Sequence, residues 1–231
     1  MTVVTMNTLN KIPVFFQLGT SVCQFLLENT SLLTFESGEI IYHYGEALEG
    51  MYALVSGHVK LYRESGDRVQ ILALLRQGDC FGTEALSDVP ASSYIAASLK
   101  NAQVLFIPKN TIKQLMIDHP QVRITILQLT TDRLRQFATL VHNLAFRDVI
   151  ARLATVILMR AEEDGIASDE GIRVARLMTQ SELATMVGTV REVVLRTFKK
   201  LEAQDIIRVS RKEIIILDMD KLRAIAEEEN R

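Results

Sequence analysis

The chain has 231 residues, of which 48% are hydrophobic and 23% are charged, and its formal net charge is −2. This length allows one large or two ordinary domains with real cores, and the composition is that of a soluble globular protein. No apolar stretch is long enough to cross a bilayer, and the N-terminal segment lacks a basic start and a cleavage site. We therefore expect a cytoplasmic protein without a membrane partner.

The motifs of common enzyme classes are missing from the sequence. It contains no Walker loop, G-x-S-x-G elbow, HExxH or paired-carboxylate arrangement. Cys23 and Cys80 match no metal-ligand spacing, so we expect them to be reduced, buried thiols. The sequence therefore predicts a protein that is not an enzyme and that has no metal site.

Short apolar runs alternate with turn residues from about residue 32 to residue 108. Glycines separate these runs at intervals typical of strands. The runs Met51–Val55 and His58–Tyr62, for example, flank Ser56-Gly57 and are expected to form two separate strands. Several short strands with regular turn signals predict an antiparallel sandwich or barrel.

A long helical segment follows, from Asn110 to Leu144, and we expect it to be bent or interrupted at His119-Pro120. After the proline, apolar residues recur with the spacing of a coiled-coil seam: Leu127, Leu134, Phe137, Val141 and Leu144. The stripe is wide enough that a core helix of a single chain would also explain it. Pairing of two copies is the better interpretation if a DNA-reading motif follows, because symmetric half-sites require two-fold symmetry.

Residues 148–231 contain such a motif. Thr179 with Glu182, and Thr189 with Glu192, are T-x-x-E patterns in which we expect the threonine to cap a helix and the glutamate to bond back. Gly188 lies between them, where a tight or left-handed turn favours a residue without a side chain. Two short runs rich in β-branched residues follow and are joined by basic residues, as in a wing behind a helix-turn-helix.

The second helix of this motif combines an apolar face with a charged one. Arg191 and Arg196 can each donate two hydrogen bonds to guanine, and Glu192 can accept one from cytosine N4. A solvated helix face with i, i+4 charge pairs is the alternative explanation. The charge distribution favours DNA, since residues 176–212 have a net charge of +4 and residues 31–108 a net charge of −4.

The order of β-roll, long helix and winged helix-turn-helix resembles the superfamily of the cAMP receptor protein and the fumarate/nitrate reduction regulator (Crp/Fnr). Further landmarks carry the resemblance: Ser37-Gly38-Glu39, Gly45-Glu46, Val55-Ser56-Gly57, Gly78–Gly82, Asn143–Asp148 and Thr179–Leu201. It implies an α+β fold with an N-terminal antiparallel β-roll in residues 1–109, a dimerisation helix and hinge in residues 110–146, and a winged helix-turn-helix in residues 147–231.

The resemblance also implies a function. It implies a homodimeric, nucleoid-associated transcription regulator that binds an inverted-repeat operator in double-stranded DNA and works with RNA polymerase. Where many members have a small hydroxyl residue on the reading helix, this chain has Val190 and Val193, which suit thymine methyl groups. The expected DNA-contacting residues are Thr179, Gln180, Thr189, Val190, Arg191, Glu192, Val193, Arg196, Lys199, Lys200, Arg211 and Lys212.

The effector region departs from the nucleotide-binding members of this superfamily. Their Gly-Glu pair aligns with Gly82-Thr83, and their phosphate-binding Arg-Ser pair aligns with Ser92-Ser93. A serine hydroxyl cannot replace a guanidinium at an anion, so we expect an effector other than cAMP, or none. The expected pocket comprises Gly82, Thr83, Glu84, Ala85, Ser92, Ser93, Phe137 and Ala138.

Other sensing chemistries remain alternatives, and the sequence establishes no cofactor. Two isolated cysteines cannot hold an iron–sulfur cluster, but haem could use any one of four histidines as an axial ligand. These histidines are His43, His58, His119 and His142. Oxidant sensing by Cys80 is a further alternative. Two rival classes are a β-roll regulatory subunit that acts through protein contacts and an oligomerising scaffold.

Overall fold

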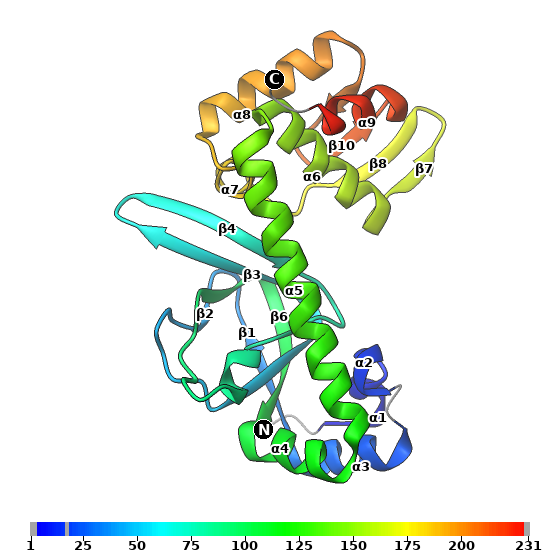
Figure 1. Cartoon of the computed structure of the whole chain (residues 1–231). Helices are drawn as coiled ribbons and strands as arrows, with labels where there is room; N and C mark the ends of the chain where they lie inside the picture. The colour runs from blue at the N-terminus through cyan, green and yellow to red at the C-terminus, as the bar shows by residue number, and fades with distance from the viewer. Residues whose placement is uncertain (1–3, 17–18, 229–231) are drawn as a thin grey trace. The chain divides into compact units, whose positions relative to one another are not determined.

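A computed structural model describes residues 4–16 and 19–228 (Figure 1). The chain forms two compact units. The first contains the residues up to 137 apart from 68–71, and the second contains residues 68–71 and those from 138 onward. The longest helix, α5 (Pro120–Phe146), contributes to both units.

Three short helices precede the first strand: α1 (Met6–Leu9), α2 (Pro13–Phe16) and α3 (Thr20–Asn29). They cover one part of the β-sheet core, with Leu9, Ile12 and Phe15 fully buried. The same core cluster contains residues of the sheet and of the helices that follow it: Met51, Leu105, Ile107, Ile112 and Val122. Burial of these large apolar side chains stabilises the first unit, at about 1.5–3 kcal/mol each.

The first sheet has six strands: β1 (Ser31–Phe35), β2 (Ile40–Tyr42), β3 (Gly50–Ser65), β4 (Arg68–Leu75), β5 (Cys80–Phe81) and β6 (Ile95–Pro108). The main strand order is β1-β6-β3-β4, with β2 paired to β6 and β5 paired to β3. The pairings of β6 with β1, β2 and β3 are antiparallel. This confirms the antiparallel β architecture expected from the glycine-punctuated runs.

The expectation of two separate strands around Ser56-Gly57 is wrong, because β3 runs without interruption through both residues. Instead of a turn, the pairing of β3 with β6 has a series of register shifts on either side of Ser56 and His58. Gly57 has φ 84°, and a Cβ there would lie 2.1 Å from the Asn101 carbonyl oxygen. Glycine therefore permits a bulge that bends one long strand, rather than a turn that ends it.

The predicted break in the helical segment is confirmed. Helix α4 (Lys109–Asp118) has His119 as its C-cap, and Pro120 begins α5. Proline is tolerated in a first helical turn because its missing N–H would have no partner there. The buried residues of α5 lie near its start, at Val122, Thr125 and Ile126. Of these, Val122 and Ile126 belong to the hydrophobic core of the first unit.

The second unit is a helix-turn-helix domain with a small sheet. It contains α6 (Val149–Asp164), β7 (Ile166–Ser168), β8 (Gly171–Ala175), α7 (Gln180–Val187), α8 (Arg191–Ala203), β9 (Ile207–Val209), β10 (Glu213–Ile216) and α9 (Met219–Glu227). The strand order is β7-β8-β10-β9, with antiparallel pairs throughout. The Asp148 side chain accepts a hydrogen bond from the Ala151 N–H and so caps α6.

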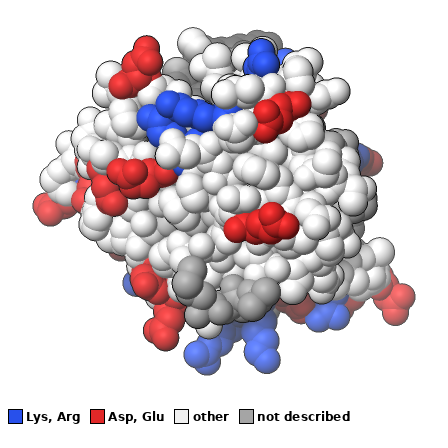
Figure 2. All heavy atoms as spheres, turned by 90° about the horizontal axis from the view of Figure 1, so that it is seen from below, with Lys and Arg blue, Asp and Glu red and all other residues white. Residues whose placement is uncertain are grey.

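Figure 2 shows acidic and basic side chains interspersed on a mostly uncharged face. Among residues 4–16 and 19–228, no helix combines the length and the apolar character that crossing a bilayer requires. The candidate sites lie in the helix-turn-helix and in the loops of the β-roll.

Candidate nucleic-acid interface and effector site

The start of α7 is fixed by a capping box, as the sequence predicted. The Glu182 N–H donates to Thr179 Oγ1 at 3.1 Å, and the Thr179 N–H donates to Glu182 Oε2 at 2.9 Å. Both bonds satisfy amides that have no acceptor within the helix, and such a cap is worth about 1 kcal/mol. The first helix of the motif therefore begins at a defined residue.

The turn between α7 and α8 is left-handed at Gly188, with φ 69° and ψ 49°. The Thr189 N–H donates to the Ala184 carbonyl across this turn at 2.9 Å. A Cβ at residue 188 would approach Leu144 Cδ2 to 2.6 Å. The left-handed backbone conformation therefore favours glycine at residue 188, and a Cβ there would also require the Leu144 side chain to shift.

The second expected capping box does not form. Helix α8 begins at Arg191, its N-cap is Val190, and no side chain caps it. Since Thr189 precedes the N-cap residue, its hydroxyl is not in the capping position, and Glu192 is the second helical residue instead of the third. The Glu192 side chain is exposed and has no capping role.

The two faces of α8 are separated as expected. Val194, Phe198 and Leu201 are buried, with at most 3% of each residue exposed. The predicted DNA-contacting residues outside this core face are all accessible. Those that are exposed are Thr179, Val190, Arg191, Glu192, Arg196, Lys199, Lys200, Arg211 and Lys212, and those that are half-buried are Gln180, Thr189 and Val193.

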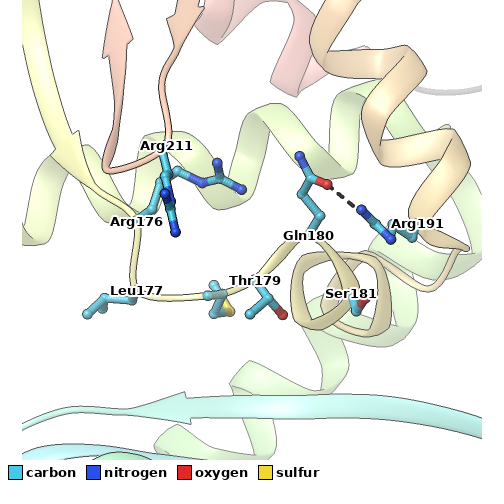
Figure 3. A pocket seen from close by; sticks show the side chains of 8 residues that line it. Arg176, Leu177, Thr179, Gln180, Ser181, Arg191 and Arg211 are labelled. Carbon is cyan, nitrogen blue, oxygen red and sulfur yellow. Dashed lines mark hydrogen bonds between the residues drawn. The ribbon is translucent and has the colours of Figure 1, made fainter.

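An open groove of about 430 Å³ lies between the start of α7, the start of α8 and the wing (Figure 3). Thr179, Gln180 and Ser181 line it at the start of α7, Arg191 from α8 and Arg211 from the turn between β9 and β10. Arg191 Nε donates to Gln180 Oε1 at 3.4 Å, which links the two helices at the rim. The structure therefore brings together Gln180, Arg191 and Arg211, which lie far apart in the sequence.

Arg176 also lines this groove, although the sequence did not indicate it as a site residue. Its Nη1 donates to the Ser210 carbonyl at 3.0 Å, and its backbone N–H donates to the Lys212 carbonyl at 2.9 Å. Arg176 thus joins the segment before α7 to the wing. Its position three residues before the Thr179 cap was the available signal, since side chains that precede a helix start often lie beside its first turn.

The predicted effector loop is built around Gly82, which adopts the left-handed conformation and begins the short helix η1 (Thr83–Leu86). Glu84 Oε2 accepts a hydrogen bond from the Tyr94 hydroxyl at 3.2 Å. Burial raises the pKa of Tyr94, and the neighbouring Glu84 charge raises it further. The phenol therefore stays protonated and donates to the carboxylate.

Aromatic side chains fill the space next to this loop. The Tyr52 and Phe81 rings stack with centroids 5.2 Å apart, and Tyr42 lies 6.1 Å from both Phe81 and Tyr94. Phe137 of α5 meets Tyr94 edge to face at 6.3 Å. Of the expected pocket, the structure thus connects Glu84 and Phe137 through Tyr94, whereas Ser93 and Ala138 are exposed.

Ser92 and Ser93 give this region no cationic side chain at the positions that align with the phosphate-binding Arg-Ser pair. Ser92 is 2% exposed, and its hydroxyl donates to the Tyr94 carbonyl. The structure supplies two guanidinium groups that the sequence did not indicate. Arg133 Nη2 donates to the Cys80 carbonyl at 3.3 Å, and Arg63 Nη1 donates to the Ser93 carbonyl at 3.0 Å.

Helix α5 leaves part of its apolar surface uncovered. Leu127, Leu134 and Val141, which are seven residues apart, are 65%, 67% and 65% exposed. The two remaining residues of the expected seam are half-buried within the chain: Phe137 packs on the β-roll core, and Leu144 lies beside Gly188. The exposed apolar stripe therefore contains three of the five residues that the sequence pattern placed on the seam.

None of the four histidines in the described residues is buried, as an axial haem ligand in an apolar pocket would be. Within the same residues, no three His, Cys, Asp or Glu side chains are grouped as they would be around a metal ion.

Comparison with known proteins identifies the two halves of the chain in the same order. A model of the cyclic nucleotide-binding domain matches residues 32–119, and a model of the Crp-like helix-turn-helix domain matches residues 151–225. The chain belongs to the Crp/Fnr superfamily. It is a DNA-binding transcription regulator of the Crp/Fnr type.

Relatives and solved structures agree with this assignment. The global nitrogen regulator of Synechocystis sp. is 28% identical over 88% of this chain and 89% of its own length. A CRP-like cAMP-activated global transcriptional regulator of Mycobacterium tuberculosis is 26% identical over 81% of this chain and 84% of its own. FixK2 from Bradyrhizobium japonicum has the same fold, with a TM-score of 0.76 at 22% identity over 86% of this chain and 98% of that one.

Cys80 lies beside the effector loop of this Crp/Fnr regulator, but its thiol has the wrong environment for oxidant sensing. Burial raises its pKa to about 12, the Asp79 charge raises it as well, and Arg133 only partly opposes them. The thiol therefore stays protonated at pH 8, and the reactive thiolate is scarce. Burial also raises the pKa of Cys23.

We therefore predict that iodoacetamide at pH 8 alkylates neither cysteine in the folded protein and alkylates both in urea, where burial no longer raises their pKa. Intact mass measures the number of labels, and tryptic mapping assigns each label to Cys23 or to Cys80. Rapid alkylation of Cys80 in the folded protein would contradict the prediction.

Proposed function

We propose that the protein is a homodimeric, sequence-specific regulator that reads an inverted repeat in double-stranded DNA with the exposed face of α8. The single observation that carries this proposal is the division of α8 into a buried apolar face and an exposed face with Arg191, Glu192 and Arg196. Guanidinium groups pair with guanine O6 and N7, and a carboxylate accepts from cytosine N4. Each half-site therefore contains G·C pairs.

The other predicted contacts position α8 in the major groove. Lys199 and Lys200 follow the reading residues along the helix, and Arg211 and Lys212 lie in the wing turn. Cations at these places suit phosphates, which fix the register without reading sequence. Val190, at the start of α8, is 59% exposed and suits a thymine methyl group.

Dimerisation is proposed through α5. The exposed stripe of Leu127, Leu134 and Val141 has the seven-residue period of a coiled coil, and its burial against a second copy would remove this apolar surface from water. Two-fold symmetry then places the reading helices roughly 34 Å apart on one face of the duplex. By analogy with the superfamily, the dimer acts with RNA polymerase on the nucleoid in the cytoplasm.

The effector is proposed to be a molecule other than cAMP, or none. The contact between Tyr94 and Phe137 supports a route from the loop to α5, since Tyr94 also bonds Glu84. In this proposal, an event at the loop changes helix pairing, and the segment Asn143–Asp148 reorients the reading helices. Haem sensing is the alternative, and absorption spectra of the purified protein test it.

Selection of binding sites from random duplexes tests the function. The unmodified protein should select an inverted repeat, and Arg191→Ala should cost about 1–3 kcal/mol per half-site and relax the preference at one base pair. Lys221→Ala, an exposed change on α9, serves as the control and should leave the selected sequence unchanged. An identical logo for Arg191→Ala would remove the role assigned to Arg191.

Leu134→Lys should dissociate the dimer, because pairing would bury two like charges at the seam. Leu134 is exposed in the single chain, so its own fold should persist, as circular dichroism can check. Ile117→Lys on α4, where the residue is 68% exposed, is the matched control. Sedimentation should give a monomer for the first variant and a dimer for the second. A dimeric Leu134→Lys protein would refute this interface.

Addition of cAMP should change neither the affinity for the selected duplex nor the thermal unfolding temperature, because Ser92-Ser93 stands where the nucleotide-binding members have the arginine that binds the cyclic phosphate. Native mass spectrometry of the purified protein should show no bound cyclic nucleotide. A saturable rise in unfolding temperature with cAMP would count against this expectation.

A further inference from the structure

We propose that the second unit binds one chloride ion in a small cavity between Arg160 of α6 and Arg176, which follows β8. The cavity measures about 30 Å³, and both arginines line it. It is a different space from the open groove of Figure 3, which Arg176 also lines. Because a cavity of about 10–15 Å³ already holds one water molecule, this one has room for a single small ion.

Each of the two arginines has a buried N–H group that lacks an acceptor. Arg160 is 5% exposed, and its Nη1 and Nη2 donate to Glu163 and Asp164, which leaves its Nε without a partner. Arg176 Nη1 donates to the Ser210 carbonyl, and its Nε is likewise buried and unpartnered within residues 4–16 and 19–228. Since buried donors in native proteins nearly always have an acceptor, a bound group is expected beside these two.

The lining of the cavity does not supply that acceptor. Apart from the two arginines, the described lining residues have aliphatic or thioether side chains, as Val156, Val174 and Leu183 do. An ion in the open groove could not supply it either, because the Nε of Arg176 is buried. The acceptor must therefore lie within the cavity.

The chemistry of the lining favours chloride over water. A water molecule that accepts from two guanidinium groups must donate its own hydrogens, but no other described lining side chain offers an oxygen. Chloride only accepts hydrogen bonds. It also carries the negative charge that Arg176 lacks, because no carboxylate of the described residues forms an ion pair with this half-buried guanidinium. Phosphate and carboxylate ligands are too large for the cavity.

The ion would connect three parts of the second unit. Arg160 belongs to α6, whereas Arg176 is bonded to the wing through the Ser210 carbonyl and through its own N–H to the Lys212 carbonyl. A ligand that binds the folded state alone raises stability by mass action. Chloride should therefore stabilise the DNA-binding unit in the absence of DNA, whatever sequence α8 reads.

Thermal unfolding of the full-length protein without DNA tests the site. Chloride replaces isethionate, an organic anion too large for the cavity, at constant ionic strength, so that screening does not change. The unfolding temperature should rise in a saturable way, by about 3–6 °C once chloride is about tenfold above its Kd. An unfolding temperature that does not respond to the exchange would overturn the proposal.

Three substitutions assign the effect to the cavity. Arg160→Lys and Arg176→Lys keep the positive charge but remove the Nε–H of the guanidinium, so neither should respond to chloride. Val174→Ile keeps both arginines and adds a methyl group to the lining, and it should abolish the response as well. Arg173→Lys, an exposed change on the same strand outside the cavity, is the matched control and should keep the full rise.

Circular dichroism in isethionate checks that each variant is folded, and the three substitutions are independent of one another. A full chloride response in a folded Arg160→Lys or Arg176→Lys protein would contradict the site, as would loss of the response in Arg173→Lys.

Crystals of the full-length protein grown in bromide identify the occupant directly. We expect one anomalous scattering peak per chain, within hydrogen-bond distance of both Nε atoms. Density there without anomalous signal would mean that the occupant is water, and the chloride proposal would then be wrong. The proposed function is tested separately, since the effect of Arg191→Ala on the selected duplex does not depend on the occupant of this cavity.

Discussion

The helix-turn-helix of this protein depends on the left-handed turn at Gly188. The residue has φ 69°, and its missing side chain leaves room for Leu144. Any other L-residue would be strained in that conformation and would also meet the Leu144 methyl group. The left-handed turn that joins α7 to α8 therefore depends on this residue, and α8, which carries Arg191 and Arg196, begins three residues later.

Much of the fold was predictable because its signals are local. The Thr179–Glu182 box, the Pro120 break and the apolar face of α8 each depend on residues within a few positions, and all three are confirmed. The failures have non-local causes. Gly57 bends a strand because β6 lies against it, and Thr189 does not cap α8 because the turn places the N-cap at Val190.

The site was predictable to the same extent. Periodicity located the charged face of α8, but it could not show that Arg176 lies beside Arg211, since 34 residues separate Arg176 from Ser210 and only the wing hairpin returns the chain to it. Likewise, spacing placed Phe137 on the expected seam, whereas packing on Tyr94 holds it against its own chain. In both cases, contacts between segments that are far apart in the sequence determine where the side chain lies.

The two ends of the chain are under different chemical constraints. The edges of guanine and cytosine are the same in every duplex, so the base-reading role proposed for Arg191, Glu192 and Arg196 has a fixed chemical partner. A small-molecule site has no such fixed partner, and here Glu84, Tyr94 and Phe137 bond and pack with one another. Membership of the superfamily therefore establishes DNA binding, while the effector must be deduced from the side chains of this loop. Because Phe137 belongs to α5, a ligand that displaced it from Tyr94 would act directly on the helix proposed to pair the two copies.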